Sequence, residues 1–465
     1  MKRKKTILFG ITNNFFKEPL SLISNELISR GYNVIILTSS RKVNNYFLLK
    51  SPDVRSIYLP KAGRSLGLKY SDTALDKLFK KYNFNQEQFF FRETKILGRK
   101  KKCLRHYSFP ILSYLDKFFE EEKIDYFVNC GEGLSNIMMW RVSKKTDAEY
   151  FHTTWVGYID NMHYWDSDLN RISWIKPEFL KKKMTKADLK IAEDFLSGSK
   201  KAKKVQGFEP RKVFTYYFFK KYLMYLYNYI STGPARMETY SPPTLANLWV
   251  SRFFKRLYYR SYYKDFDKTE KYFYFPLHLY YDAIIALTNQ KFYRQDDAIK
   301  MVAENIPKDH IIITKEHPVL DGTMPFDMMS VISKLDNVKI VNPHTNSHEL
   351  IKNSSGVITI ASSVGWEAMQ YGKPVITLAD TFFDYKNLTR KANSEAELKK
   401  LAKQAADGKL KFNKNDLLQY TYSFVKSHQP NDYFAEDSLS FDRSAKNIRG
   451  LADAIEAEIK YREGN

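Results

Sequence analysis

The chain has 465 residues, of which 43% are hydrophobic and 27% charged, and its formal net charge is +23. This composition excludes a disordered chain, and the length exceeds what one hydrophobic core usually organises, so we expect two domains. The positive charge favours an anionic partner: a nucleic acid, an anionic bilayer surface, or a phosphorylated or acidic substrate.

The chain opens with a strand–helix–strand pattern. An apolar run at Thr6–Ile11 predicts a strand, Pro19–Arg30 an amphipathic helix, and Asn33–Thr38 a second strand. This is a Rossmann-like start without a GxGxxG motif, so a dinucleotide cofactor is not expected. The first apolar run is too short for a signal peptide. Residues 41–105 are polar and basic, and we expect an insertion there more than a core.

A carboxylate between two glycines follows the next predicted strand, Ile124–Asn129. Glu132 lies in Cys130-Gly131-Glu132-Gly133, ahead of a predicted helix that runs to about Lys145. A side chain on such a turn is open to substrate, which makes Glu132 a candidate catalytic group. An acidic residue near a helix start is also ordinary, because it offsets the helix dipole.

A polar and aromatic loop at residues 157–174 follows a predicted strand at Glu149–Thr153. Loops of this length are usually functional or disordered, and the aromatic content argues against disorder. Its polar residues include Asp166, Asp168 and Asn170. The aspartates suit a ligand, a nucleophile or a simple turn-forming role.

The segment 176–265 is helical by pattern, basic and aromatic. Four basic residues share one predicted helical face: Arg252, Lys255, Arg256 and Arg260. That face suits a helix lying on an anionic membrane. Aromatic core helices with a solvated basic rim are the competing interpretation. Nucleic acid is a weaker third, because no recognition motif accompanies the basic stripe.

Three strand ends are predicted to meet at one edge of a second sheet. The first strand, Tyr272–Phe275, leads into Pro276-Leu277-His278 and Asp282. The second, Ile311–Thr314, ends in Lys315-Glu316-His317-Pro318. The third, Gly356–Ile360, leads through Ala361-Ser362-Ser363 into a predicted helix at Val364–Tyr371. Backbone N–H groups at that helix start would bind an anion, or the two serines only cap the helix.

These motifs resemble the bacterial capsule polysaccharide biosynthesis family, which includes retaining β-Kdo transferases that use CMP-Kdo. The resemblance is good over about residues 271–390 and looser over 124–174, and it departs from the family at His278, where Gln is common. The matching segments are Phe275-Pro276-Leu277-His278 with Asp282, Lys315-Glu316-His317-Pro318, Ser362-Ser363-Val364-Gly365-Trp366-Glu367-Ala368 and Gly372-Lys373-Pro374-Val375.

The resemblance implies a division of roles among these residues. It assigns the nucleotide phosphate and sugar to His317, Ser362 and Ser363, with Pro318 in the same His-Pro motif. Glu367, one turn into the helix, is a candidate acceptor for ribose hydroxyls. Lys315 either adds a cationic contact to the nucleotide or only solvates the strand end. The resemblance assigns further substrate contacts to His278, Asp282 and Asn170. Glu132 resembles the acid/base that deprotonates the acceptor hydroxyl, and a retaining reaction invites a carboxylate nucleophile, for which Asp166 or Asp168 is the candidate.

The expected fold is α/β and GT-B-like, with two Rossmann-like domains facing across a cleft and a basic aromatic helical segment between them. The expected function is sugar transfer from a nucleotide donor, with Kdo or another acidic sugar on CMP favoured, to a lipid-linked or growing surface glycan. A UDP- or GDP-sugar transferase, a sugar-nucleotide epimerase or hydrolase, and a polyol-phosphate transferase remain alternatives, as does a non-enzymatic basic binding protein. The expected divisions are 1–175, 176–265, 266–440 and a closing helix at 441–465.

The cellular setting follows from the cysteines and the hydropathy. Cys103 and Cys130 lack metal-binding spacing, which favours a reducing compartment and no thiolate metal site. The sequence contains no apolar run long enough to predict a transmembrane span. We therefore expect a cytoplasmic protein at the inner face of the cytoplasmic membrane, with no metal, no cofactor and no nucleic-acid partner.

Overall fold

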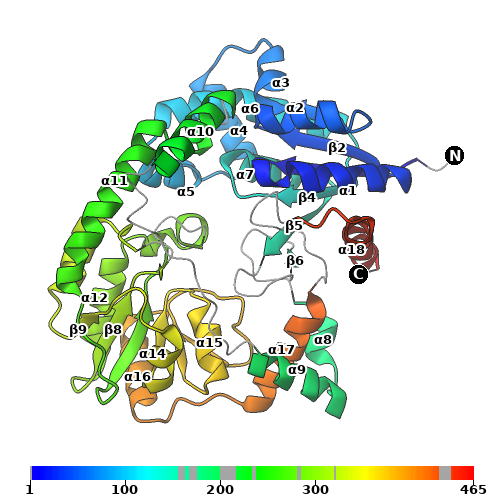
Figure 1. The fold of residues 1–465 in the computed structure, drawn as a ribbon. Coiled ribbons are helices and arrows are strands. Elements are labelled where there is room, and N and C mark those ends of the chain that lie inside the picture. Colours follow the sequence, from blue (N-terminus) through cyan, green and yellow to red (C-terminus); the bar gives the residue numbers. More distant parts are fainter. Residues whose placement is uncertain are drawn as a thin grey trace. The chain divides into compact units, whose positions relative to one another are not determined.

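A computed structural model describes residues 3–155, 163–166, 175–198, 216–232, 237–279, 284–318, 321–428 and 441–464. These residues form two compact α/β units, each built on its own sheet (Figure 1). Unit 1 comprises Met1–Trp174, Lys221–Thr244 and His428–Asn465, and unit 2 comprises Ile175–Lys220 and Leu245–Ser427. The expected fold class, two units with Rossmann-like parallel sheets, is confirmed.

The sheet of unit 1 has the strand order β3-β2-β1-β4-β5-β6. Its strands are β1 (Thr6–Ile11), β2 (Asn33–Thr38), β3 (Arg55–Tyr58), β4 (Tyr126–Cys130), β5 (Glu149–Trp155) and β6 (His163–Asp166). All neighbours are parallel except β5 and β6. Both β1 and β4 are buried along their whole length, as strands covered on both faces should be. The strand order reverses between β1 and β4, where ligands bind in open α/β sheets.

Helices cover both faces of this sheet. They are α1 (Lys17–Ser29), α2 (Arg41–Lys50), α3 (Leu59–Ser65), α4 (Asp72–Lys81), α5 (Gln86–Phe89), α6 (Lys101–Glu121), α7 (Leu134–Ser143) and α18 (Ala445–Glu463), with a short π-helix at Arg92–Ile96. One core joins Leu8 and Phe127 to α6, and the other joins Ile7 and Phe9 to α18. The closing helix therefore packs in unit 1.

The expectation of an insertion over residues 41–105 is wrong. That segment supplies the edge strand β3, and Leu75 and Phe79 of α4 are part of the same core as α6. These two residues stand four apart on an amphipathic helix, so they reach the core together while the polar majority of the segment faces outward. A high polar content concealed the narrow apolar stripe.

The sheet of unit 2 has the order β12-β11-β10-β7-β8-β9, and all neighbouring strands are parallel. Its strands are β7 (Tyr272–Pro276), β8 (Ile311–Lys315), β9 (Val338–Ile340), β10 (Gly356–Thr359), β11 (Val375–Thr377) and β12 (Arg390–Lys391). The order reverses between β7 and β10. Both strands are buried along their length. The predicted strands of this half end within one residue of the observed ones.

The helices of unit 2 include the one that follows the Ser-Ser motif, α15 (Val364–Gln370). The others are α8 (Pro177–Lys181), α9 (Lys186–Gly198), α12 (Gln295–Asn305), α13 (Phe326–Ser333), α14 (Ser347–Asn353), α16 (Glu395–Ala406) and α17 (Lys414–Ser427). Trp366 of α15 is fully buried, and its ring stacks on Phe424 of α17 at 5.5 Å. This contact fixes α15 against the rest of the unit.

Helix α11 (Pro242–Tyr259) corrects both interpretations of the basic stripe. The Arg256 guanidinium pairs with the buried carboxylate of Asp321 at 2.6 Å, and Arg252 Nε donates to the Asp321 carbonyl at 2.8 Å. Two of the four expected surface cations therefore anchor the helix to its own unit. The apolar Phe254 is instead 60% exposed. Sequence pattern alone does not reveal these contacts, because Asp321 lies far away in the chain.

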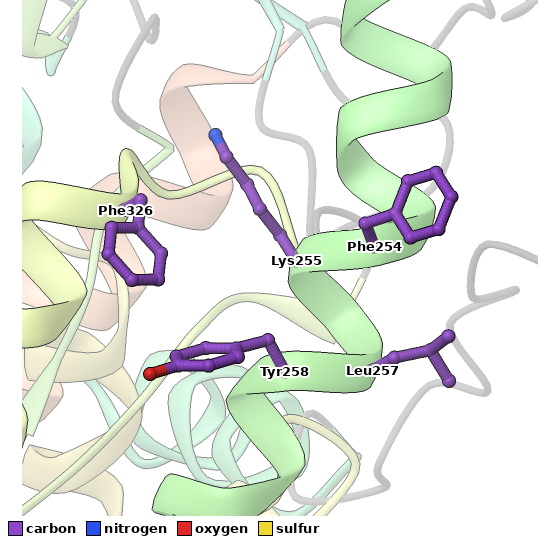
Figure 2. A pocket seen from close by; sticks show the side chains of 5 residues that line it. All are labelled: Phe254, Lys255, Leu257, Tyr258 and Phe326. Atoms are coloured by element: carbon purple, nitrogen blue, oxygen red, sulfur yellow. The ribbon is translucent and has the colours of Figure 1, made fainter.

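The exposed apolar side of α11 borders a shallow hollow of about 530 Å³ (Figure 2). Tyr258 and Phe326 face each other there, with ring centroids 5.2 Å apart, and Lys255 extends beside them. Phe254 and Leu257 also line the hollow, and in Figure 2 they project from the side of the helix away from Phe326. Helix α10 (Tyr216–Thr232) likewise exposes apolar side chains, among them Leu223, Met224, Tyr227 and Ile230. Among the described residues, no helix is both long enough and apolar enough to cross a membrane.

Candidate functional site

A buried histidine joins the two strand ends at the point where the order of the unit 2 sheet reverses. His278, just past β7, is 8% exposed, and its Nε2 accepts a hydrogen bond of 3.3 Å from the Ala361 N–H, just past β10. Its backbone N–H donates to Gln295 Oε1, and Gln295 Nε2 donates to its carbonyl, at 2.8 and 3.1 Å. His278 thus links the ends of β7 and β10 at this edge of the sheet.

Lys315 is the last residue of β8 and is buried. Its ammonium donates to the backbone carbonyls of Pro343 and Thr345, at 3.0 and 2.6 Å. Burial lowers the pKa of Lys315 to about 8, and the nearby Glu367 carboxylate opposes that change. Because two of its three protons are held by the backbone, Lys315 braces the strand end and acts on a ligand mainly through its charge.

Glu316 has a role that the sequence analysis missed. Its carboxylate accepts hydrogen bonds from the backbone N–H groups of Gly322 and Met324, both at 3.0 Å. Burial raises the pKa of Glu316 to about 7, although these two bonds oppose the change. Glu316 therefore anchors the loop that follows the motif, while the neighbouring His317 is exposed at the carboxyl end of β8 and Pro318 is half-buried.

The Ser-Ser turn differs in part from the expected row of open N–H groups. The Ser362 N–H donates to Thr359 Oγ1 at 3.0 Å, and the Val364 N–H donates to Ser362 Oγ at 3.3 Å. These groups are therefore engaged locally. In the described part of the chain, no residue partners the N–H or the hydroxyl of Ser363, which is half-exposed. Ser363 is the member of the pair with donors to offer.

Glu367 lies one turn into α15 and interacts electrostatically with Lys315. Burial raises the pKa of Glu367 to about 7, and the Lys315 charge opposes that change. The two side chains come from different strand ends of one sheet. An acid and a base whose pKa values are drawn together near neutrality are typical of functional sites, although structural ion pairs show the same shifts.

The Gly131-Glu132-Gly133 turn lies at the matching position of unit 1, directly after β4. Gly131 has a positive φ of 150°, which favours glycine. Glu132 is half-buried, and its carbonyl accepts a hydrogen bond of 2.9 Å from Arg92. Arg92 also forms an ion pair with Glu93, which is 1% exposed. The hydrogen bond from Arg92 therefore ties the turn to the π-helix at Arg92–Ile96. Short π-helices are frequent at functional sites.

Sequence analysis also missed Glu238, which reaches this turn from the connection between α10 and α11. Its Oε1 accepts hydrogen bonds from the Tyr107 hydroxyl at 2.7 Å and from the Ser135 hydroxyl and N–H. Burial raises the pKa of Glu238. One signal was present: Glu238 is the only acidic residue between positions 210 and 264 of a strongly basic stretch.

The remaining candidates are placed only in part. Asp166 ends β6, whose backbone pairs it with His152, three residues before the carboxyl end of β5. Asp168, Asn170 and Asp282 lie outside the described residues. Within the described ranges, no three His, Cys, Asp or Glu side chains are grouped to hold a metal ion.

Comparison with known proteins agrees with the motifs of unit 2. Residues 241–425 match the sequence profile of a family described as "Capsule polysaccharide biosynthesis protein". The family region contains His278, Lys315, His317, Ser363 and Glu367, so the resemblance drawn from these motifs is confirmed.

Individual relatives are more distant. Protein FixF of Sinorhizobium fredii (strain NBRC 101917 / NGR234) is 35% identical over 107 residues, which cover 22% of this chain and 24% of that protein. The match therefore spans about a quarter of the length of this curated relative.

Solved structures with some likeness include two enzymes. The Thermosulfurimonas dismutans KpsC β-Kdo 2,7 transferase is 16% identical with a TM-score of 0.39, covering 67% of this chain and 79% of that one. The Methanocaldococcus jannaschii UDP-GlcNAc 2-epimerase with UDP-GlcNAc and UDP is 16% identical with a TM-score of 0.29, covering 91% and 99%. At such TM-scores the fold assignment rests on the strand orders described above.

Proposed function

We propose that this protein is a glycosyltransferase of capsule or surface polysaccharide biosynthesis. It transfers a sugar from a nucleotide donor to a lipid-linked or growing glycan, and CMP-Kdo or another CMP-linked acidic sugar is the favoured donor. The observation that carries the proposal is the edge of the unit 2 sheet, where the family motifs converge at the reversal of strand order. Ligands of open α/β sheets bind at that position.

Three groups in this region suit a nucleotide phosphate. His317 is exposed at the end of β8, Ser363 has an unengaged N–H and hydroxyl among the described residues, and Lys315 contributes positive charge. Preorganised donors and cations stabilise the charge that develops on a phosphate leaving group as a glycosidic bond breaks. Ser362 and Pro318 shape the two turns, and Glu367 accepts hydrogen bonds from ribose hydroxyls. This division of roles needs no metal ion or cofactor.

The acceptor side of the reaction is assigned to unit 1. Glu132 lies on a held turn at the carboxyl edge of the sheet and serves as the base that takes the proton of the attacking hydroxyl. In a retaining reaction a second carboxylate forms the glycosyl intermediate, and Asp166 or Asp168 supplies it. Asp282 and Asn170 are the proposed further substrate contacts. His278, expected as a third, is buried with its Nε2 on the Ala361 N–H and instead supports the strand ends.

A thermal-shift titration tests the donor. If CMP fills a site built by His317 and Ser363, CMP at about 100 times its dissociation constant raises the apparent melting temperature by about 5–10 °C. We expect His317→Ala to lose most of that increase. His310→Ala is a change at the other end of the same strand, β8, and this variant should keep the full increase in melting temperature. A response to UDP or GDP in place of CMP would change the donor, and no response to any nucleotide would contradict the proposal.

Helix α10 is the part of the chain that best suits an anionic membrane surface. Its exposed side chains are Phe219, Leu223, Met224, Tyr227 and Ile230, and Lys220 and Lys221 beside them are also exposed. An apolar row with flanking lysines lies in the headgroup region of anionic bilayers, where each cation contributes about 1 kcal/mol. Peripheral attachment at the inner face of the cytoplasmic membrane would bring the enzyme to a lipid-linked acceptor.

Vesicle sedimentation tests this attachment. With vesicles of about 30% anionic lipid, we expect the double variant Leu223→Glu, Ile230→Glu to bind about tenfold more weakly than wild type, because it removes apolar area and adds repulsion. Leu49→Glu is the matched control, since Leu49 is 80% exposed on α2 of unit 1. Equal binding by the double variant and the wild type would rule out α10 as the contact.

A further inference from the structure

We propose that Glu238 is a positioning residue whose carboxylate holds the Gly131–Gly133 turn against the amino end of α7, and thereby fixes the place from which Glu132 acts. The turn and Glu238 belong to the same unit. The inference rests on the acid/base role proposed for Glu132, but the contact itself is testable without any substrate.

The two carboxylate oxygens of Glu238 have different surroundings. Oε1 accepts hydrogen bonds from three hydroxyl groups, those of Ser39, Tyr107 and Ser135, and from the Ser135 N–H at the start of α7. Oε2 is buried and, among the described residues, has no hydrogen-bond partner. When one oxygen of a buried carboxylate accepts several hydrogen bonds and the other accepts none, the donors hold the carboxylate in a single orientation.

The bare oxygen lies directly against Gly133. A Cβ built on Gly133 would overlap Glu238 Oε2, and it would also lie 3.0 Å from Thr12 Oγ1. The backbone of Gly133, with φ −69° and ψ 165°, is one that any residue adopts. Glycine is therefore needed here by the carboxylate and not by backbone conformation, which means that the turn and Glu238 are fitted to each other.

A second contact holds the same turn. Arg92 donates to the Glu132 carbonyl, and Glu93 holds Arg92 in place. Glu132 thus lies between two restraints, Arg92 on its own carbonyl and Glu238 on the next residue. Both restraints act on the backbone, so they fix the Cα of Glu132. A displacement of 1 Å at such a site is enough to lower a rate about 100-fold.

Glu238 has charged and titratable neighbours among the described residues. Arg92 and Glu93 face it from the π-helix, and Tyr107 faces it from α6. The positioning role depends on shape and hydrogen bonding, so a neutral glutamine at 238 should retain most of it: its Oε1 accepts the same donors. An alanine should lose it.

The first experiment follows backbone hydrogen exchange in peptides that cover residues 131–136. We expect Glu238→Ala to speed exchange there about tenfold, since the Ser135 N–H loses its acceptor, and Glu238→Gln to stay close to wild type. The matched control is Glu458→Ala, because Glu458 is also buried in unit 1 and accepts from Arg462, which in turn binds Glu149 at the amino end of β5. Unchanged exchange in Glu238→Ala would overturn the inference.

A double-mutant cycle tests the same contact from the other side, through the effect of Gly133→Ala in the wild-type and Glu238→Ala backgrounds. We expect Gly133→Ala to lower the apparent melting temperature by about 4 °C in wild type and by clearly less in the Glu238→Ala background, because the overlap is then gone. Equal losses in both backgrounds would mean that Glu238 does not pack against Gly133 in solution.

Kinetics separate a positioning role from a purely structural one. In the transfer reaction, Glu238→Ala should lower kcat at least tenfold with little change in the KM for the donor, and Glu238→Gln should restore most of kcat. Wild-type kcat in folded Glu238→Ala, or no rescue by glutamine, would overturn the inference. If the wild-type protein bound no nucleotide and transferred no sugar, the proposed function would fail, while the exchange and the cycle would still test the contact.

Discussion

Replacing Glu132 by glutamine is expected to lower the rate of sugar transfer about 100-fold or more. Glutamine keeps the size of the side chain but cannot take a proton from the acceptor hydroxyl, and general-base catalysis typically contributes 10²–10⁴-fold, about 3–5 kcal/mol of barrier. The backbone contact from Arg92 to the Glu132 carbonyl survives the change. The measurement is release of nucleotide from the donor, with extracted lipid-linked glycan as the acceptor.

Two controls make this result specific. Glu120→Gln changes a glutamate that is 65% exposed on α6 of the same unit, and it should leave the rate unchanged. Nucleotide binding by Glu132→Gln should also match wild type, because the proposed donor groups belong to unit 2. A Glu132→Gln enzyme with more than about a tenth of wild-type rate would remove Glu132 from the proposed mechanism.

Replacing Trp366 by alanine is expected to cost about 3–5 kcal/mol of stability, the range found when large aromatic side chains are removed from cores. Trp366 is fully buried in unit 2 and packs against Tyr420 and Phe424, with ring centroids 5.6 and 5.5 Å away. Because Trp366 stands two residues after the helix start that carries Ser363, its loss should also weaken nucleotide binding indirectly.

Trp366→Phe is the informative partner variant. Among the described residues, the indole N–H of Trp366 is buried without a hydrogen-bond acceptor, so phenylalanine removes an unfavourable group while keeping most of the apolar contact. We expect it to cost only about 1 kcal/mol. Urea unfolding followed by far-ultraviolet circular dichroism compares the stability of the two variants. Equal unfolding midpoints would show that the Trp366 side chain is not part of a tightly packed core.

Much of this fold was predictable because its strands are short, rich in β-branched or aromatic residues, and bounded by turn residues. The motif segments of unit 2 lie where the sequence placed them, at the ends of β7, β8 and β10. The sequence could not show that Lys315 is held by carbonyls or that Glu316 holds a loop, since both facts depend on residues 343–345 and 322–324 folding back onto the strand end.

Contacts that are distant in sequence account for the remaining errors. Arg252 and Arg256 look like surface cations until Asp321, some 65 residues later, is brought against them. Glu238 looks like an isolated acid until it meets Ser135, which lies 103 residues earlier in the chain. For the two arginines, local periodicity gave the correct helix and the wrong partner, because pairing of buried charges is decided by tertiary structure.

The return of α18 to unit 1 has a consequence for synthesis. Leu451, Ile455 and Ile459 complete the core that also contains Ile7 and Phe9, so the first strand made waits for the last helix. Residues 245–427, by contrast, supply the whole sheet of unit 2 and are made without interruption. During translation, unit 2 is therefore able to fold while the apolar face of unit 1 that receives α18 is still uncovered. Until α18 has been made, that face is a surface that chaperones would recognise.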